Sequence, residues 1–325
     1  MNLIIHIFLT SIVPILLLIG GGFFIDKKFN LDLRTLSKLN FYILLPAFIF
    51  QSLYTAPLNH ESFEIALCAF VIMFSNSGLV SFLNLFLHYD KMKVQIIRNS
   101  TMFNNGGNIG VAIATFVFSN MPYVVNGTTP YVQLGIVAVV STFVIQTIGC
   151  NTLGFYQAGV GRLTRRDALS LIFHMPIVYA VIASLLFKLA PFDLTKFIIW
   201  PPVHYYAAAF VGLSMITLGT QLSRSSLNFF KKDVMIGTAL RLLAGPALAA
   251  LIVIIFIHVY GPLNPIAAQA IVITYSVPSA VNTALMAFEM KNNPEFATQI
   301  VMATTILSAI TMPLAIIFAY YLFPI

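Results

Sequence analysis

Charged residues are scarce in this chain. Of its 325 residues only 8% are Asp, Glu, Lys or Arg, and 59% are hydrophobic. Soluble globular proteins carry about 25% charged residues. Apolar stretches of roughly 20 residues recur along the whole chain, and each is long enough to cross a bilayer. The composition therefore excludes a soluble protein and predicts a helical membrane protein without a soluble domain.

Cysteines and catalytic groupings are also scarce. The two cysteines, Cys68 and Cys150, lie inside apolar stretches, where a free cysteine behaves as a small hydrophobic residue. We therefore expect neither a disulfide framework nor a metal site. The sequence shows no nucleophile–base pair and no metal-ligand cluster. Gly106-Gly107 is not followed by the Gly-Lys-Ser/Thr of a phosphate-binding loop. Neither an enzyme nor a cofactor is expected.

Acidic residues are not expected in the middle of the membrane. All ten lie in loops or near the ends of apolar stretches, although intramembrane acids usually mark ion pathways. A sodium or proton site built on a buried carboxylate is therefore not predicted. Glu289 ends an apolar stretch. We interpret it as a residue that reaches the membrane interface, and a coupling role is the alternative.

The apolar stretches predict ten membrane spans. They cover residues 4–25, 36–54, 63–87, 95–118, 131–157, 170–190, 201–220, 234–259, 265–290 and 297–323. The connections are short. The most polar of them, 159–169, divides the chain into two five-span halves, 1–158 and 170–325.

The basic residues predict the orientation. Loops after odd-numbered spans carry 14 Lys and Arg residues, and loops after even-numbered spans carry 2. The positive-inside rule then places the loop 159–169 in the cytoplasm and both termini outside. Because each half has an odd number of spans, the halves enter the membrane from opposite sides, which predicts an inverted repeat. The net charge of +7 therefore indicates topology, and no nucleic-acid partner is expected.

Two of the spans are interrupted at their midpoints. The first break, 104–108, reads Asn-Asn-Gly-Gly-Asn, and the second break, 276–282, reads Ser-Val-Pro-Ser-Ala-Val-Asn. Such backbone forms poor helix and is tolerated at membrane depth only when buried in protein or lining a wet cavity. Broken spans in corresponding places of two halves are the best sequence indication of a transporter's binding site.

The candidate substrate-binding residues lie in these breaks. They are Asn104, Asn105, Gly106, Gly107, Asn108, Ser276, Pro278, Ser279 and Asn282. A broken helix presents free N–H groups and partial positive charge at the start of its second half, which suits an anion without a basic side chain. The polar side chains either donate to a ligand carboxylate or only cap the helix ends.

One basic residue lies inside a span. Arg241 is about two turns into the span 234–259. It either draws anions toward the cavity or extends along its helix to the lipid headgroups, and we favour the second interpretation.

The residues around both breaks resemble a known family, the auxin efflux carriers of bacteria and plants. The stretch 105–113 is similar to the family's N-T-G-x-x-G-x-P-L motif, and 278–289 and 304–314 are similar to its second crossover and closing helix. Similarity extends to Pro14, to 44–47 and to Pro176, and so covers nearly the whole chain. The chain departs from the family at Asn104, where plant members have proline, and at Ala112, where many members have a second proline.

The resemblance implies an all-α membrane protein of ten transmembrane helices. They would form a 5+5 inverted repeat with two broken, crossing helices, as in bile-acid symporters and sodium–proton antiporters. Spans one, two, six and seven would form a scaffold, and the other six a transport unit.

The function implied is secondary transport of a small carboxylate such as auxin, malate or malonate by alternating access. The location implied is the plasma membrane, which is the inner membrane in bacteria. The expected partners are the carboxylate and the lipid bilayer. A proton is a candidate coupling ion, and a homodimer through the scaffold helices is a candidate assembly. The alternative is a membrane sensor that binds a metabolite in the same cavity. It is disfavoured because no cytoplasmic loop is long enough for an output domain.

Overall fold

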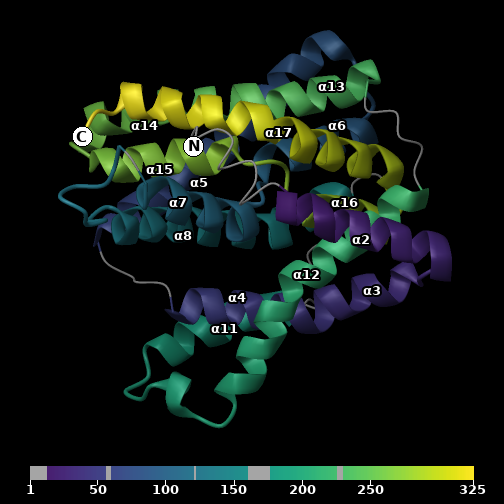
Figure 1. The fold of residues 1–325 in the computed structure, drawn as a ribbon. Helices are drawn as coiled ribbons and strands as arrows, with labels where there is room; N and C mark the ends of the chain where they lie inside the picture. Colours follow the sequence, from purple (N-terminus) through teal and green to yellow (C-terminus); the bar gives the residue numbers. More distant parts are fainter. Residues whose placement is uncertain (1–12, 56–59, 121, 160–175, 225–229) are drawn as a thin grey trace.

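The structure, a computed structural model, describes residues 13–55, 60–120, 122–159, 176–224 and 230–325. The regular structure of these residues is helical (Figure 1). Within the described residues, six helices are long and apolar enough to cross a membrane: Leu33–Thr55, His60–Leu87, Val132–Ala158, Trp200–Arg224, Lys232–Tyr260 and Pro294–Leu322. The predicted class, a helical protein with several membrane spans, is confirmed by these segments. The count of ten spans stays a prediction.

The helices follow the predicted ranges in chain order. They are α2 (Val13–Phe29), α3 (Leu33–Leu39), α4 (Leu45–Thr55), α5 (His60–Leu87), α6 (Lys91–Met102), α7 (Val111–Phe118), α8 (Val132–Gly149), α9 (Phe155–Ala158), α11 (Pro176–Lys188), α12 (Trp200–Arg224), α13 (Lys232–Ala239), α14 (Gly245–Tyr260), α15 (Pro265–Ser276), α16 (Val281–Glu289) and α17 (Pro294–Leu322). Four π-helical turns join or extend them: η2 (Asn40–Leu44), η3 (Gly106–Gly110), η4 (Cys150–Gly154) and η6 (Leu240–Ala244). Such π-turns often mark functional sites.

The helices form two groups. In the scaffold group, α2, α3 and α4 pack with α11 and α12. Helices α3, α4 and α11 lie in the lower part of Figure 1, and α2 lies at its right. In the break group, the two interrupted helix pairs pack with α5, α8, α13, α14 and α17. The scaffold group contains the described parts of predicted spans one, two, six and seven, the grouping that the family resemblance implies.

Within the scaffold group, α2 and α12 are in backbone contact. A Cβ added at Gly22 would lie 2.2 Å from the Ile216 carbonyl oxygen, and one added at Gly219 would lie 2.0 Å from the Ile19 carbonyl oxygen. Small residues permit this close approach between membrane helices. Glycine is therefore required at these two positions.

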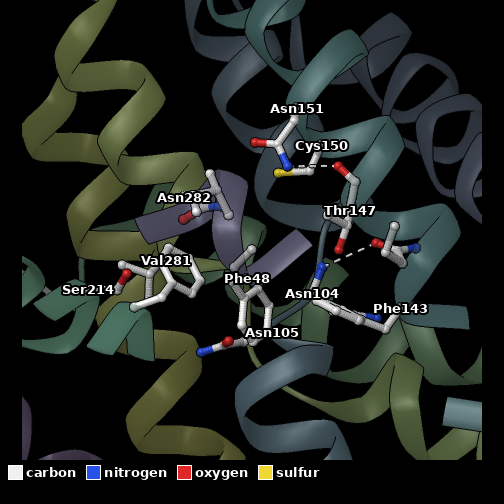
Figure 2. Close-up of a pocket in the computed structure, with 14 residues that line it drawn as sticks. Phe48, Asn104, Asn105, Phe143, Thr147, Cys150, Asn151, Ser214, Val281 and Asn282 are labelled. Carbon is white, nitrogen blue, oxygen red and sulfur yellow. Dashed lines mark hydrogen bonds between the residues drawn. The ribbon is translucent and has the colours of Figure 1, made fainter. Parts of the chain in front are cut away.

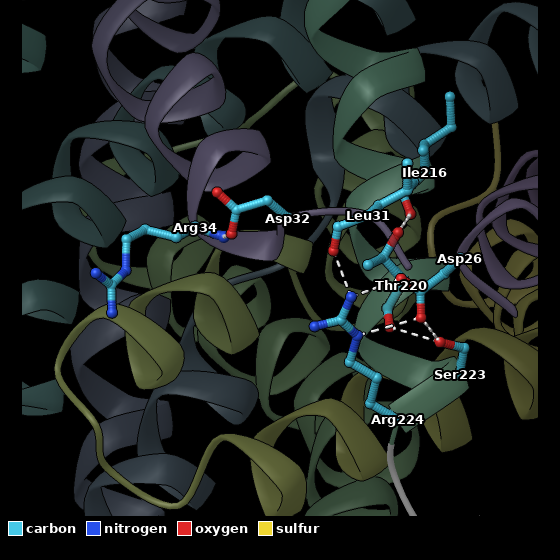
Figure 3. Close-up of polar contacts among 8 residues, drawn as sticks. All are labelled: Asp26, Leu31, Asp32, Arg34, Ile216, Thr220, Ser223 and Arg224. Carbon is cyan, nitrogen blue, oxygen red and sulfur yellow. Dashed lines mark hydrogen bonds and ion pairs between the residues drawn. The ribbon is translucent and has the colours of Figure 1, made fainter. Parts of the chain in front are cut away.

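An ion pair joins the same two helices at one end. Arg224 Nη2 lies 2.7 Å from Asp26 Oδ1, and the Arg224 guanidinium also donates to the Leu31 carbonyl (Figure 3). The Ser223 hydroxyl donates to the other oxygen of Asp26. Because this carboxylate is only 4% exposed, its partners offset the cost of burying its charge.

The buried apolar residues form two clusters, and each interrupted helix pair contributes to both. One cluster contains Met102 of α6 and Leu285 of α16. The other contains Ile113 of α7 and Ile271 of α15. The first half of each interrupted pair therefore packs with the second half of the other. The breaks lie where the two clusters meet.

Candidate functional site

Both predicted breaks interrupt helices in the structure. Helix α6 ends at Met102, and helical backbone resumes at Gly106 in η3. Helix α15 ends at Ser276, and α16 begins at Val281. In the first break, only the asparagine pair is non-helical, because its three C-terminal residues already belong to the π-turn. Gly107 and Asn108 contribute described backbone to this turn, whereas the side-chain position of Asn108 lies outside what the structure describes.

The two non-helical stretches pair with each other. Asn104 and Ser279 form an antiparallel bridge. The Asn105 N–H donates to the Pro278 carbonyl at 2.9 Å, and the Ala280 N–H donates to the Phe103 carbonyl at 3.0 Å. Buried backbone groups need such partners, especially in a membrane. Each break therefore provides hydrogen-bond partners for backbone groups of the other break that have no helical partner.

Asn104 uses its side chain to hold the break. Its Oδ1 accepts from the Gly106 N–H at 3.0 Å, and its Nδ2 donates to the Thr274 carbonyl at 3.0 Å. The first bond caps the start of η3, and the second ties the first break to the end of α15. Asn104 therefore fits the capping interpretation.

The serines of the second break are also engaged with backbone. The Ser279 hydroxyl donates to the Ser100 carbonyl at 2.7 Å, and the Ser276 hydroxyl donates to the Ile273 carbonyl at 2.7 Å. Both serines are fully buried. Neither belongs to the set of residues that line the cavity described next. They too have structural partners.

A cavity of about 40 Å³ lies beside the breaks (Figure 2). It is lined by Leu45, Phe48, Asn104, Asn105, Phe143, Gln146, Thr147, Cys150, Asn151, Phe210, Ser214, Ala280, Val281 and Asn282. These residues come from α4 and α12 of the scaffold group, and from the breaks, α8, η4 and α16 of the break group. The cavity therefore lies between the two groups. None of these lining residues is charged.

Asn105 and Asn282 differ from Asn104, Ser276 and Ser279. Both line the cavity, and within the described residues neither side-chain amide has a hydrogen-bond partner. The N-cap of α16 is Ala280, which provides no side-chain cap, so Asn282 is not the capping residue. Asn105 is buried and Asn282 is partly buried, and polar groups in such places normally have a hydrogen-bond partner. The two amides are therefore free to bind a ligand or water in the cavity.

The structure shows that our preferred interpretation of Arg241 is wrong. It does not extend to the headgroups, because its side chain is fully buried. Its Nε donates to the Val277 carbonyl at 3.0 Å, its Nη1 to the Thr101 carbonyl at 2.7 Å and its Nη2 to the Tyr275 carbonyl at 2.6 Å. The wrong expectation came from its position near a span end. Arg241 is buried because the two breaks leave these backbone carbonyls without helical partners, and its guanidinium donates to them.

Comparison with known proteins identifies the kind of protein that carries this site. A family model described as "Membrane transport protein" matches residues 160–316. An uncharacterized transporter from Methanothermobacter thermautotrophicus is 25% identical over 286 residues, which are 87% of this chain and 88% of that protein. The second half of the chain is therefore similar to this membrane transport protein family, and most of the chain is similar to a transporter. The recognition of the auxin efflux carrier family from the break residues is thereby confirmed.

The comparisons also confirm that the protein is a membrane transporter and not an enzyme. The family match includes the second break, whereas the first break lies outside residues 160–316. Within the described residues, no group of His, Cys, Asp and Glu could hold a metal ion. Both cysteines of the transporter are buried and free.

Several residues around the transporter's cavity were missed by sequence reasoning. Gln146 accepts from the Asn104 N–H at 3.3 Å and donates to the Tyr275 hydroxyl at 2.8 Å. Asn151 donates to the Thr147 carbonyl at 2.8 Å, and its buried Oδ1 has no partner among the described residues. Both residues are amides within an apolar span, and polar side chains there usually face the protein interior. This position in the sequence could have indicated that they lie near the cavity.

The described carboxylates lie away from the cavity. Asp233, at the start of α13, pairs with Lys93 and accepts from the Tyr89 hydroxyl at 2.5 Å. Burial raises the pKa of Tyr89 to about 12, so this residue keeps the proton that it donates. Glu289 is the exposed last residue of α16, as expected for an interface residue. None of the described acidic residues lines the cavity.

Proposed function

We propose that this transporter moves a small organic anion across the membrane, and that the anion's carboxylate binds in the cavity beside the two breaks. The observation that carries this proposal is the pair of unpartnered amides, Asn105 and Asn282, in a cavity without charged walls. An amide N–H₂ group donates to a carboxylate. The cavity also adjoins the start of α16, where free N–H groups and the helix dipole favour an anion.

The proposed architecture is a 5+5 inverted repeat in which the interrupted helix pairs cross at their breaks. Two observations support it: the hydrogen bonds between the breaks, and the contribution of each interrupted pair to both apolar clusters. The backbone of Gly106, Gly107, Asn108 and Pro278 would contribute to the site through these crossed segments. The side chains of Asn104, Ser276 and Ser279 would hold the crossing in shape.

Transport would proceed by alternating access. Phe48 and Phe210 line the cavity from the scaffold group, and Asn105 and Asn282 line it from the break group. A shift of one group against the other would therefore change which end of the cavity is open. Secondary transporters with inverted repeats hold their substrate at such an interface.

The cavity favours a small monocarboxylate over a dicarboxylate. Its volume of about 40 Å³ is room for a few water molecules, because one water requires roughly 10–15 Å³. Phe48, Phe143 and Phe210 line it and would contact the apolar body of a substrate. A second carboxylate would lose its hydration without finding a charged partner among the lining residues, which is costly.

Counterflow into proteoliposomes tests this function. The purified protein is reconstituted with an unlabelled candidate inside, and the uptake of labelled short monocarboxylates, dicarboxylates and neutral amides is compared. We expect exchange of monocarboxylates, weaker exchange of dicarboxylates and none of the amides. Exchange of amides at the same rate as acids would contradict an anion site. A variant with both amides removed, Asn105→Ala with Asn282→Ala, is the control for leak.

A further inference from the structure

We propose that Arg241 takes the place of a coupling cation in this transporter. Its guanidinium binds backbone carbonyls at the ends of α6 and α15, beside the two breaks. A transporter of this architecture would otherwise bind a metal cation such as sodium there. The site is thereby positive without any bound ion. This inference extends the proposed function by stating why the anion is accepted and which ion is not required.

The carbonyls that Arg241 contacts belong to the ends of two helices. Thr101 lies in the last turn of α6, and Tyr275 and Val277 lie at the end of α15. Such ends carry partial negative charge and carbonyls without helical partners. In transporters with broken helices, these carbonyls are typical sodium ligands. In this chain, three nitrogens of one guanidinium are their donors.

No carboxylate balances the charge of Arg241 among the described residues. The ion pairs found there involve other cations, among them Lys93 with Asp233 and Arg224 with Asp26. Besides the three carbonyls, the ring of Tyr275 lies near the guanidinium, with its centroid 6.0 Å from Cζ. The positive charge is therefore opposed by dipoles and by a ring face, and it remains available to attract an anion.

The arginine is connected to the cavity through hydrogen bonds. The Tyr275 hydroxyl accepts from Gln146 and donates to the Ala69 carbonyl. Gln146 in turn accepts from the Asn104 N–H, and both Gln146 and Asn104 line the cavity. Arg241 itself does not line it. It is therefore a positioning residue that acts through its charge and through the geometry of the breaks.

The local backbone and the arginine side chain both suit this role. It lies in the π-turn η6, between α13 and α14. A π-turn changes the direction of the side chains that follow it relative to a regular helix, and such turns are frequent at functional sites. A lysine would supply the same charge, but its ammonium is a point charge and lacks the planar fork of a guanidinium.

Cation dependence tests the proposal. Melting temperature and substrate affinity are measured in sodium, lithium, potassium and choline chloride at one ionic strength, for the wild type, Arg241→Lys, Arg241→Gln and Arg241→Ser. The wild type and Arg241→Lys should give the same values in all four salts. In Arg241→Ser the carbonyls lose their donor, so sodium or lithium should raise its melting temperature relative to choline.

Arg241→Gln separates charge from hydrogen bonding. It retains two donors and loses the charge, and a unit charge on the order of 10 Å from an anion changes its affinity about tenfold at an effective dielectric of about 20. We therefore expect folded protein with affinity lowered about tenfold, and recovery in Arg241→Lys. Unchanged affinity in Arg241→Gln, or a wild type that requires sodium for stability or exchange, would overturn the proposal.

The test remains decisive if one variant does not fold. Should Arg241→Ser not fold in any salt, the wild-type salt series and the comparison of Arg241→Gln with Arg241→Lys still decide the outcome. Failure of the proposed function is distinguishable, because it would appear as absence of carboxylate binding in the wild type, whereas the salt dependence of the melting temperatures would be unaffected.

Discussion

Two adjacent asparagines should respond to the same substitution in opposite ways. Asn104 makes two side-chain hydrogen bonds to backbone, at 3.0 Å each, whereas the amide of Asn105 has no partner among the described residues. If the structure separates a residue that holds the break from one that binds substrate, Asn104→Ala should lower stability and Asn105→Ala should lower affinity.

The magnitudes follow from the contacts. Asn104→Ala leaves the Gly106 N–H and the Thr274 carbonyl without a partner, and a buried unsatisfied group costs about 1–3 kcal/mol. Asn105→Ala removes no hydrogen bond within the protein, so we expect stability to change by less than about 0.5 kcal/mol. Loss of a charge-assisted bond to a carboxylate costs about 1.5–3 kcal/mol, which lowers affinity about ten- to a hundredfold.

The assay measures melting temperature and substrate affinity on the same purified proteins. Asn282→Ala should behave as Asn105→Ala does. Asn282→Asp is a matched variant of nearly unchanged size, and it should bind the anion more weakly than Asn282→Ala because it places a negative charge beside it. The reasoning would be refuted if Asn105→Ala and Asn282→Ala lowered the melting temperature as much as Asn104→Ala and left affinity unchanged. Both amides would then be structural.

Two further predictions concern the membrane topology and the scaffold group. Cysteines introduced at Asn59 and Asn126 should react with an impermeant thiol reagent added outside intact cells, and a cysteine at Gly161 should not. Labelling from outside at Gly161 alone would reverse the orientation. Gly22→Leu should prevent stable folding, because an added Cβ would lie 2.2 Å from a backbone oxygen of α12. The control Gly20→Leu, with no atom within 4 Å of the added Cβ, should fold normally, and equal behaviour of the two would contradict the close packing.

The sequence by itself determined the class of the protein, its resemblance to a family of transporters and the positions of the two breaks. Hydropathy is sufficient for the class, because each long apolar stretch must form its own hydrogen bonds in a membrane. The polar residues, the glycines and the proline within apolar spans predict the breaks, because those residue types have low helix propensity in any protein. These features depend on local composition, which is fully visible in the sequence.

The tertiary structure decided which residues of the breaks hold the backbone and which face the cavity. Asn104 and Asn105 are adjacent and chemically identical, yet the first binds the Thr274 carbonyl and the second has no described partner. Arg241 bonds to residues 140, 34 and 36 positions away in the chain. The partner of a polar side chain depends on how distant helices pack against each other, and local sequence contains no record of that packing.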